Sequence, residues 1–215
     1  MKKAVVFDLD GTLIDSLPDI AAAMNKALSV HGLPVHPQDA YKRFTGDGAV
    51  NLTRRALGES NQEHLDAVFT AYREEYAQHS RVQSAPYPGI SELLSTLQEK
   101  GMQLCVLSNK DDADTVQVIR HYFPAIRFAV VRGRREGVPV KPDPTALLGI
   151  VEEIGALPGE VWYVGDTVTD MRCGRNAGME RVAVIWGFQT QEELSTQSPE
   201  HYAHTTSELT RLLLS

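Results

Sequence analysis

Short runs of apolar residues recur along the chain, and each run ends in small or polar residues. They predict β-strands at Lys3–Phe7, Gln103–Leu107, Arg127–Val131, Val161–Val164 and Arg181–Ile185. The segments between the later runs have the length of helices, with apolar residues three and four positions apart, as in Pro144–Ile154. Strands that are apolar throughout and alternate with helices are typical of a parallel sheet covered on both faces. We therefore expect a Rossmann-like, doubly wound α/β fold with functional groups at the carboxyl ends of its strands.

One interval breaks this alternation. The first strand ends near Asp8 and the next clear one ends near Leu107, which is too long a separation for one crossover connection. Helical patterns fill the interval, at Pro18–Val30, Pro37–Phe44, Ala49–Leu57 and Glu63–His79. Pro86-Tyr87-Pro88-Gly89 then marks a return to the sheet. This pattern predicts an all-helical cap domain over residues 17–82, inserted into a catalytic core formed by residues 1–16 and 83–215.

Composition narrows the class of protein. The 215 residues are 42% hydrophobic and 23% charged, which is the usual mix of a globular protein with a genuine core. The net charge of −7 disfavours nucleic acid or an anionic membrane as the main partner, but a bound metal can still attract an anionic substrate. No apolar run approaches the roughly 18 residues of a membrane span, and the first one is too short for a signal peptide. We therefore expect a cytoplasmic protein; its oligomeric state is not indicated.

Two carboxylates follow the first predicted strand, in Phe7-Asp8-Leu9-Asp10-Gly11-Thr12. Side chains alternate along a strand, so we expect Asp8 and Asp10 to point the same way. Two acids placed together are unfavourable unless a cation or a shared proton offsets their repulsion. Asp-Gly is also a common turn sequence, so this segment alone is compatible with either a metal site or a plain turn.

Three further polar segments lie where predicted strands end or helices begin. Ser108-Asn109 could hold phosphate oxygens or serve as ordinary helix N-caps. Lys141-Pro142 precedes a helix, and its lysine is either a fixed positive charge or a solvated loop residue. Asp166 and Asp170 lie four residues apart, at a strand end and on the first turn of a helix. Oxygen ligands in such a place suit Mg²⁺, although an acid there is also a routine partner of the helix dipole.

The order of these segments carries more information than any one of them. An acid pair, Ser-Asn, Lys-Pro and a second acid pair follow one another along the edge of the predicted sheet, with a helical cap after the first. This arrangement resembles the haloacid dehalogenase-like hydrolase superfamily over essentially the whole chain. Gly165-Asp166-Thr167-Val168-Thr169-Asp170-Met171, followed by Ala177-Gly178-Met179, is most similar to the phosphoglycolate phosphatase-like branch of that superfamily.

The resemblance implies a Mg²⁺-dependent phosphatase that hydrolyses a small phosphorylated metabolite through an aspartyl-phosphate. Asp8 would be the nucleophile, Asp10 the general acid and base, and Lys141 a phosphoryl-binding charge. The metal would be held by Asp8, by the backbone carbonyl of Asp10 and by Asp166, with Asp170 as a further ligand or a supporting residue. The remaining substrate-binding residues would be Gly11, Thr12, Ser108 and Asn109 in the core and Gly46, Asp47 and Gly48 in the cap.

The cap would close over the site and select the substrate. In the next predicted helix, Arg54 or Arg55 could bind a substrate carboxylate, although a solvated charge is the commoner role for such residues. Several alternatives share the core motifs: a phosphomutase similar to β-phosphoglucomutase, and a phosphonate or pyrophosphate hydrolase. A dehalogenase would need neither Asp10 nor Mg²⁺. A phospho-receiver signalling module, the alternative of another class, would need roughly half this length and no cap.

Overall fold

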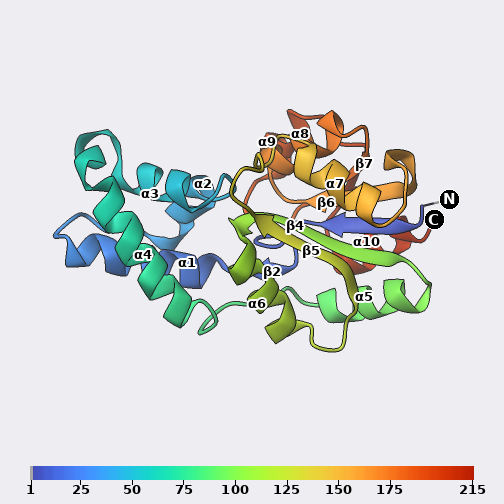
Figure 1. Ribbon diagram of the computed structural model, residues 1–215, viewed down its shortest axis with the longest axis horizontal. Helices are drawn as coiled ribbons and strands as arrows, with labels where there is room; N and C mark the ends of the chain where they lie inside the picture. Colours follow the sequence, from blue (N-terminus) through green and yellow to red (C-terminus); the bar gives the residue numbers. More distant parts are fainter. Residues whose placement is uncertain (1) are drawn as a thin grey trace. The chain divides into compact units, whose positions relative to one another are not determined.

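The computed structural model describes residues 2–215, in which the chain divides into two compact units. One unit comprises Met1–Ile14 and Pro86–Ser215, and the other comprises Asp15–Ala85 (Figure 1). The chain crosses between them at two short strands, β2 Ile14–Asp15 and β3 Ala85–Pro86, which form a small two-stranded sheet. No helix among the described residues 2–215 is both long enough and apolar enough to cross a bilayer.

The larger unit is built on a six-stranded sheet in the order β5-β4-β1-β6-β7-β8. Its strands are β1 Ala4–Phe7, β4 Gln103–Asp111, β5 Phe128–Arg134, β6 Val161–Gly165, β7 Glu180–Val184 and β8 His201–Ala203. Every pair of neighbouring strands is parallel, and the strand order reverses at the central β1. The doubly wound parallel sheet predicted from the sequence is therefore confirmed. The edge strand β8 was not predicted, because three residues are too few to show a hydrophobic period.

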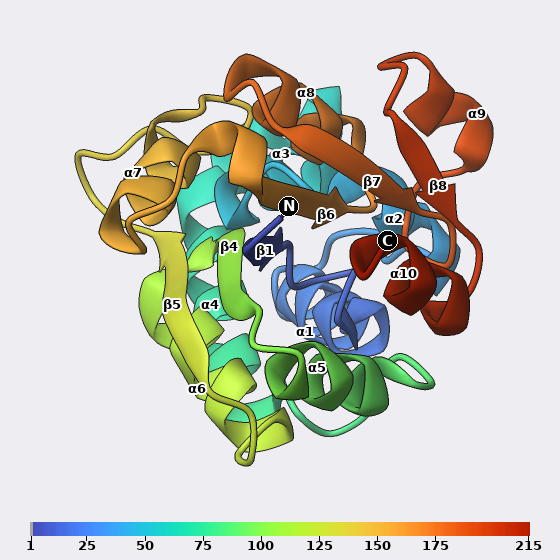
Figure 2. The same cartoon turned by 90° about the vertical axis from the view of Figure 1, so that its right-hand side faces the viewer.

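Helices cover both faces of this sheet (Figure 2). They are α5 Ile90–Glu99, α6 Asp112–Tyr122, α7 Thr145–Glu153, α8 Val168–Asn176, α9 Gln191–Ser195 and α10 Thr206–Leu213, with a 3₁₀ turn, η3, at Pro158–Glu160. Side chains alternate along β1, so Val5 and Phe7 pack with apolar residues of α5, α6 and α10. Ala4 and Val6 face the opposite way and pack with apolar residues of α7 and α8. Both faces of the sheet are therefore covered, which explains why the central strands β1 and β6 are buried at every position.

The smaller unit is helical, as the sequence predicts. Its elements are α1 Leu17–Val30, η1 Gln38–Ala40, α2 Tyr41–Phe44, α3 Ala49–Leu57, η2 Glu59–His64 and α4 Leu65–His79. The third helix has the expected bounds. The helix expected at Pro37–Phe44 is instead a 3₁₀ turn followed by the short α2, and the one expected at Glu63–His79 begins inside η2.

One buried carboxylate, Asp19, ties the two ends of the smaller unit together. Asp19 is only 2% exposed, near the start of α1. Its Oδ2 atom accepts hydrogen bonds from the backbone N–H groups of Val82 at 3.0 Å and Ser84 at 2.8 Å, and from the Ser84 hydroxyl at 2.6 Å. The backbone N–H of Gln83 donates to Oδ1 at 2.9 Å. The segment that leaves the smaller unit is thereby fixed to the helix that enters it.

The end of β1 differs from the expectation for the first acid pair. The strand ends at Phe7, so Asp8 and Asp10 lie in the loop that follows and not on one face of a strand. Asp8 still continues the sheet pairing, because its backbone N–H donates to Val164 O at 2.9 Å. The chain then turns at Gly11, whose φ of 89° favours glycine. Strand alternation therefore does not account for the placement of Asp10, because the chain has left the strand before that residue.

The end of β4 is also different. The strand continues through Ser108-Asn109 to Asp111, with a shift in its register against β5 after Leu107. The N-cap of α6 is Asp111. Ser108-Asn109 therefore does not cap a helix, and the irregular end of a strand presents these two residues instead.

Candidate active site

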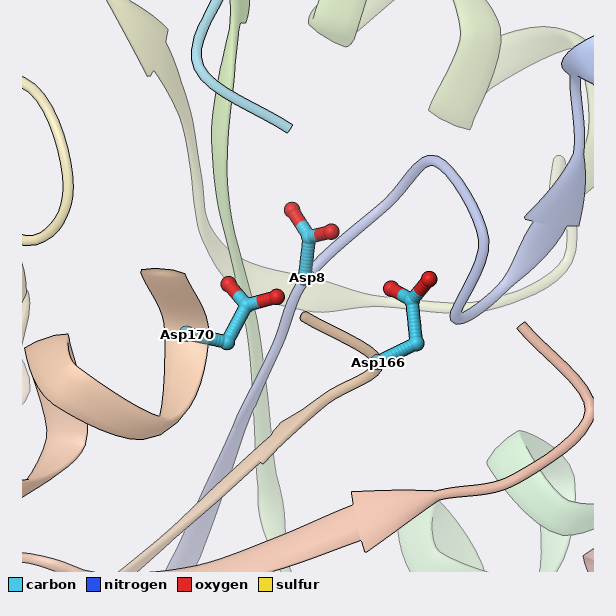
Figure 3. Close-up of side chains that lie close together, drawn as sticks. All are labelled: Asp8, Asp166 and Asp170. Atoms are coloured by element: carbon cyan, nitrogen blue, oxygen red, sulfur yellow. The ribbon is translucent and has the colours of Figure 1, made fainter. Parts of the chain in front are cut away.

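Three aspartates from separate segments meet at the carboxyl edge of the sheet. Asp8 follows β1, Asp166 follows β6, and Asp170 lies in the first turn of α8 (Figure 3). One carboxylate oxygen from each lies within 4.8 Å of the others, and the exposed fraction is 5% for Asp8 and 0% for the other two. Since β1 and β6 are neighbours where the strand order reverses, the cluster lies where doubly wound folds bind ligands.

Lys141 supplies a positive charge inside this cluster. Its Nζ atom donates to Asp8 Oδ1 at 2.6 Å, to Asp170 Oδ1 at 2.7 Å and to Leu107 O at 3.3 Å. Burial alone would lower the pKa of Lys141, but the Asp170 and Asp8 carboxylates outweigh burial and raise that pKa. Of the two interpretations open from the sequence, the structure therefore favours the fixed positive charge: Lys141 is 3% exposed and carries its proton.

The cluster has more negative than positive charge, with three carboxylates around one ammonium group. Burial raises the pKa of Asp8 to about 7, and the charge of Asp170 adds to the rise while Lys141 opposes it. Burial together with Asp8 and Asp170 also raises the pKa of Asp166 well above its ordinary value. Full ionisation is therefore unfavourable without a further cation. A divalent ion that prefers oxygen ligands would restore the balance, so the donor set fits Mg²⁺.

Asp166 is enclosed by its neighbours. Its Oδ1 atom accepts a hydrogen bond from the Thr12 hydroxyl at 2.8 Å, and its Oδ2 atom accepts one from the Phe188 backbone N–H at 2.8 Å. A Cβ atom at Gly11 would lie 2.2 Å from Asp166 Oδ2, and one at Gly187 would lie 2.3 Å from Asp166 Cβ. Both glycines are required because the backbone closes around this side chain. Thr12 and Gly11, predicted to bind substrate, are thus the immediate surroundings of Asp166.

Sequence reasoning missed the segment Trp186-Gly187-Phe188, which follows β7. The Trp186 indole N–H donates to Thr12 O at 3.1 Å, so this segment contacts both Asp166 and the loop after β1. The segment holds no charged or nucleophilic side chain, which is why a search for chemical groups passes over it. The one available signal was a glycine between two aromatic residues directly after a buried strand.

Asp170 is surrounded by hydrogen-bond donors. Its Oδ1 atom accepts from Lys141 Nζ at 2.7 Å and from the Tyr163 hydroxyl at 3.0 Å. Its Oδ2 atom accepts from the backbone N–H of Thr167 at 3.1 Å and from the Thr167 hydroxyl at 2.5 Å. The sequence left open whether Asp170 is a metal ligand or a supporting residue. These contacts orient Lys141 and cap α8, and the Asp170 carboxylate also lies within reach of an ion shared with Asp8 and Asp166, so a supporting role is evident and a ligand role stays open.

Ser108 and Asn109 lie beside Lys141 and are buried. The Asn109 side-chain oxygen accepts from the Lys141 backbone N–H at 2.9 Å, and its amide donates to Lys141 O at 3.1 Å. Asn109 therefore tethers the backbone that carries Lys141. Ser108 Oγ accepts a hydrogen bond from the backbone N–H of Lys110 at 3.2 Å. The structure brings both predicted residues to the cluster, with Asn109 directed at Lys141.

The Asp10 carboxylate lies outside the three-aspartate cluster and pairs with another lysine. Lys110 Nζ donates to Asp10 Oδ1 at 2.7 Å and to Oδ2 at 2.6 Å. The side chains of Lys110 and Asp10 are 8% and 18% exposed. Lys110 is a second residue that sequence reasoning missed, although it directly follows Ser108-Asn109. Its partner is 100 residues away along the chain, so no local pattern links the two.

The predicted specificity segment, Gly46-Asp47-Gly48, lies in the helical unit. Its two glycines have φ angles of 103° and 85°, which favour glycine. Arg55 forms an ion pair with the aspartate of this segment and donates to Phe44 O at 3.0 Å, so it holds the turn in shape. Arg54 donates to Asn51 Oδ1 at 2.8 Å. Both arginines are exposed.

Comparison with known proteins gives three consistent results. The model of the haloacid dehalogenase-like hydrolase family matches residues 5–184. A phosphoglycolate phosphatase of Aquifex aeolicus is 32% identical over 211 residues, covering 98% of this chain and 96% of the relative. An N-acetylmuramic acid 6-phosphate phosphatase of Pseudomonas aeruginosa is 31% identical over 201 residues, covering 93% of this chain and 87% of the relative. A crystal structure from Lactobacillus delbrueckii, 29% identical, matches with a TM-score of 0.94 over 99% of both chains.

The close approach of Gly187 to Asp166 gives a testable prediction. Gly187→Ala places a methyl group against Asp166, so we expect a loss of about 1–3 kcal/mol in the free energy of unfolding from overpacking. Displacing Asp166 should also weaken Mg²⁺ binding by about tenfold or more, as with other residues that orient metal ligands. Chemical denaturation and calorimetric Mg²⁺ titration measure the two effects. The control is Gly159→Ala, because a Cβ atom there meets nothing within 4 Å. Equal behaviour of the two variants would contradict the steric role of Gly187.

Proposed function

The chain belongs to the haloacid dehalogenase-like hydrolase family, and from this premise we propose that it is a Mg²⁺-dependent phosphatase acting through an aspartyl-phosphate on Asp8. The observation that carries the proposal is the burial of Asp8 against Lys141 and beside Asp166 at the switch point of the sheet. A carboxylate next to a fixed ammonium group and a cation site is suited to attack an anionic phosphoryl group.

In the first step, an Asp8 oxygen bonds to phosphorus as the bond between phosphorus and the alcohol oxygen breaks. Lys141 reduces the repulsion between the Asp8 carboxylate and the phosphoryl oxygens, and it is held for that task by Asp170 and by the Asn109 tether. Ser108, a buried hydroxyl directly before Asn109, would bind a phosphoryl oxygen.

Asp10 is the general acid and base of this mechanism. It donates a proton to the departing alcohol and later removes one from the water that hydrolyses the acyl phosphate on Asp8. Two observations support this role: Asp10 lies two residues after Asp8 in the same loop, and its charge contributes to the raised pKa of Asp8. Its side chain is also the more exposed of the two, so water can reach it.

Asp8, the backbone carbonyl of Asp10 and Asp166 would hold Mg²⁺, with Asp170 supporting the site through Lys141 and α8. The bound ion would draw negative charge away from the phosphoryl group in the transition state. Thr12 and the Phe188 backbone N–H keep the Asp166 oxygens oriented for it.

The substrate is a small metabolite that carries a carboxylate as well as a phosphate monoester. The support is chemical: phosphoglycolate and N-acetylmuramic acid 6-phosphate, named for two relatives, share both groups. We assign the choice of substrate to the helical unit, with Gly46-Asp47-Gly48 as its specificity segment and Arg54 or Arg55 as the partner of the substrate carboxylate. Neither nucleic acid nor a membrane is required as a partner.

A substrate panel tests this proposal. We expect the protein to release many equivalents of phosphate from phosphoglycolate or N-acetylmuramic acid 6-phosphate, and fewer from glucose 1-phosphate and pyrophosphate. A phosphate-release assay on all four compounds measures this. A phospho-receiver would stop near one equivalent, and a mutase would convert glucose 1-phosphate to its 6-phosphate without releasing phosphate. Either outcome would remove the phosphatase assignment.

Replacing the proposed nucleophile gives a further prediction. Asp8→Asn should lower kcat at least about a hundredfold, a rise of at least about 2.7 kcal/mol in the barrier, because the amide cannot form the acyl phosphate. Circular dichroism should show an intact fold. Asp39→Asn is a suitable control, since the Asp39 side chain is 88% exposed. Retention of more than a hundredth of the wild-type kcat would exclude covalent catalysis at Asp8.

Metal removal gives another prediction. Treatment with EDTA should abolish activity and addition of Mg²⁺ should restore it, since the buried carboxylates need a cation to balance their charge. Ca²⁺ should inhibit, because its larger and looser coordination shell misplaces the attacking oxygen. Steady-state rates in metal-buffered solutions check both points. Full activity without a divalent metal would remove the role assigned to Asp166.

A further inference from the structure

Lys110 is a partly buried lysine for which the mechanism above has no role. It lies near the end of β4, and its side chain is 8% exposed. Its backbone is firmly placed: the N–H donates to Ser108 Oγ at 3.2 Å, and a Cβ atom at Gly133 would lie only 2.6 Å from Lys110 O. A lysine whose backbone is held in this way has less conformational freedom than a surface lysine. The contact that its ammonium group makes is therefore a defined feature of the structure.

The ammonium group of Lys110 reaches both oxygens of Asp10, at 2.7 Å and 2.6 Å. A donor that contacts both oxygens of a carboxylate restricts the rotation of the side chain as well as its position. The chain leaves β1 before Asp10, whose backbone forms only an isolated β-bridge with Ile14, so the six-stranded sheet does not hold this side chain. Lys110 therefore supplies a constraint on Asp10 that the backbone leaves open.

The surrounding charges make that constraint necessary. Asp8, Asp166 and Asp170 bring three carboxylates together, and Lys141 is already shared between Asp8 and Asp170. Asp10 adds a further negative charge close enough to raise the pKa of Asp8. Repulsion would turn an unpaired Asp10 side chain away from this cluster and toward water. The ion pair of Lys110 with Asp10 is partly shielded from solvent, so the attraction between these two charges is strengthened and opposes that repulsion.

We propose that Lys110 is a positioning residue that acts through Asp10: its ammonium group holds the Asp10 carboxylate beside Asp8, where protons must be delivered and collected. The two loop aspartates are then each anchored by a lysine from elsewhere in the chain, Asp8 by Lys141 and Asp10 by Lys110. This inference rests on the proposed role of Asp10 as general acid and base.

The test compares leaving groups. Lys110→Met should slow phosphoenzyme formation from an alkyl phosphate about tenfold to a hundredfold, because a misplaced acid no longer protonates the alkoxide. Formation from 4-nitrophenyl phosphate, whose leaving group needs little protonation, should change much less. Lys110→Arg, which keeps the charge, should recover most of the loss. Rapid-quench mass spectrometry of the Asp8 phosphoenzyme measures each rate. Lys100→Met on the exposed end of α5 is the matched control and should equal wild type.

A double-mutant cycle separates this inference from the proposed function. In the Asp10→Asn background, Lys110→Met should cause no further decrease in the rate of phosphoenzyme formation, because both changes remove protonation of the leaving group by Asp10. The positioning role would be overturned if Lys110→Met lowered the rate equally in the wild-type and Asp10→Asn backgrounds, or equally for alkyl and aryl phosphates. If Asp10→Asn itself does not change the rate of phosphoenzyme formation from either the alkyl or the aryl phosphate, Asp10 is not the general acid and base, and the role of Lys110 is excluded with it. Thermal unfolding and Mg²⁺ titration check that each variant is intact, and Lys110→Gln replaces Lys110→Met if that variant unfolds.

Discussion

The arrangement of the whole site depends on one unfavourable interaction, the burial of several carboxylates within a few ångströms of one another. Moving an ionised carboxylate out of water costs several kcal/mol, and like charges beside it add to the cost. Each aspartate is therefore surrounded by compensating groups: Lys141 for Asp8 and Asp170, and Thr12 with the Phe188 N–H for Asp166. The remaining excess of negative charge suits the site to a divalent cation, which in the proposed function would attract an anionic substrate.

The parallel sheet makes this concentration of charge possible. Apolar helices cover both faces of the sheet, so its strands are held rigidly and their carboxyl ends converge. The loops after β1 and β6 are neighbours because these strands pair, and the first turn of α8 brings Asp170 to the same point. Small residues then permit a close fit: a Cβ atom at Gly165 would lie 2.4 Å from Asp170 Cβ. The rigidity matters for catalysis, because groups already in place need no reorganisation as charge develops.

In the proposed mechanism, the two lysine–aspartate pairs have different tasks. The pair of Lys141 with Asp8 is almost fully buried, which suits a nucleophile and a charge that must remain fixed. The pair of Lys110 with Asp10 is more exposed, which suits a group that exchanges protons with an alcohol and with water. In the helical unit, the buried Asp19 has a structural role instead, because its oxygens bind the backbone of the segment that leaves that unit.

The sequence by itself determined the sheet class, and it indicated the helical insertion and the aspartates and the lysine that meet at the sheet edge. These features can be found from local sequence patterns. The spacing of hydrophobic residues indicates which positions are buried, and the order of short motifs can be recognised without knowing which residues are in contact. Only the tertiary structure decided how the side chains are paired. Asp10 meets Lys110 across 100 residues, Asp166 meets Thr12 across 154, and Asn109 meets Lys141 across 32. Such partners are set by which strands are neighbours and by how each loop leaves its strand, and neither is encoded in the spacing of residues along the chain.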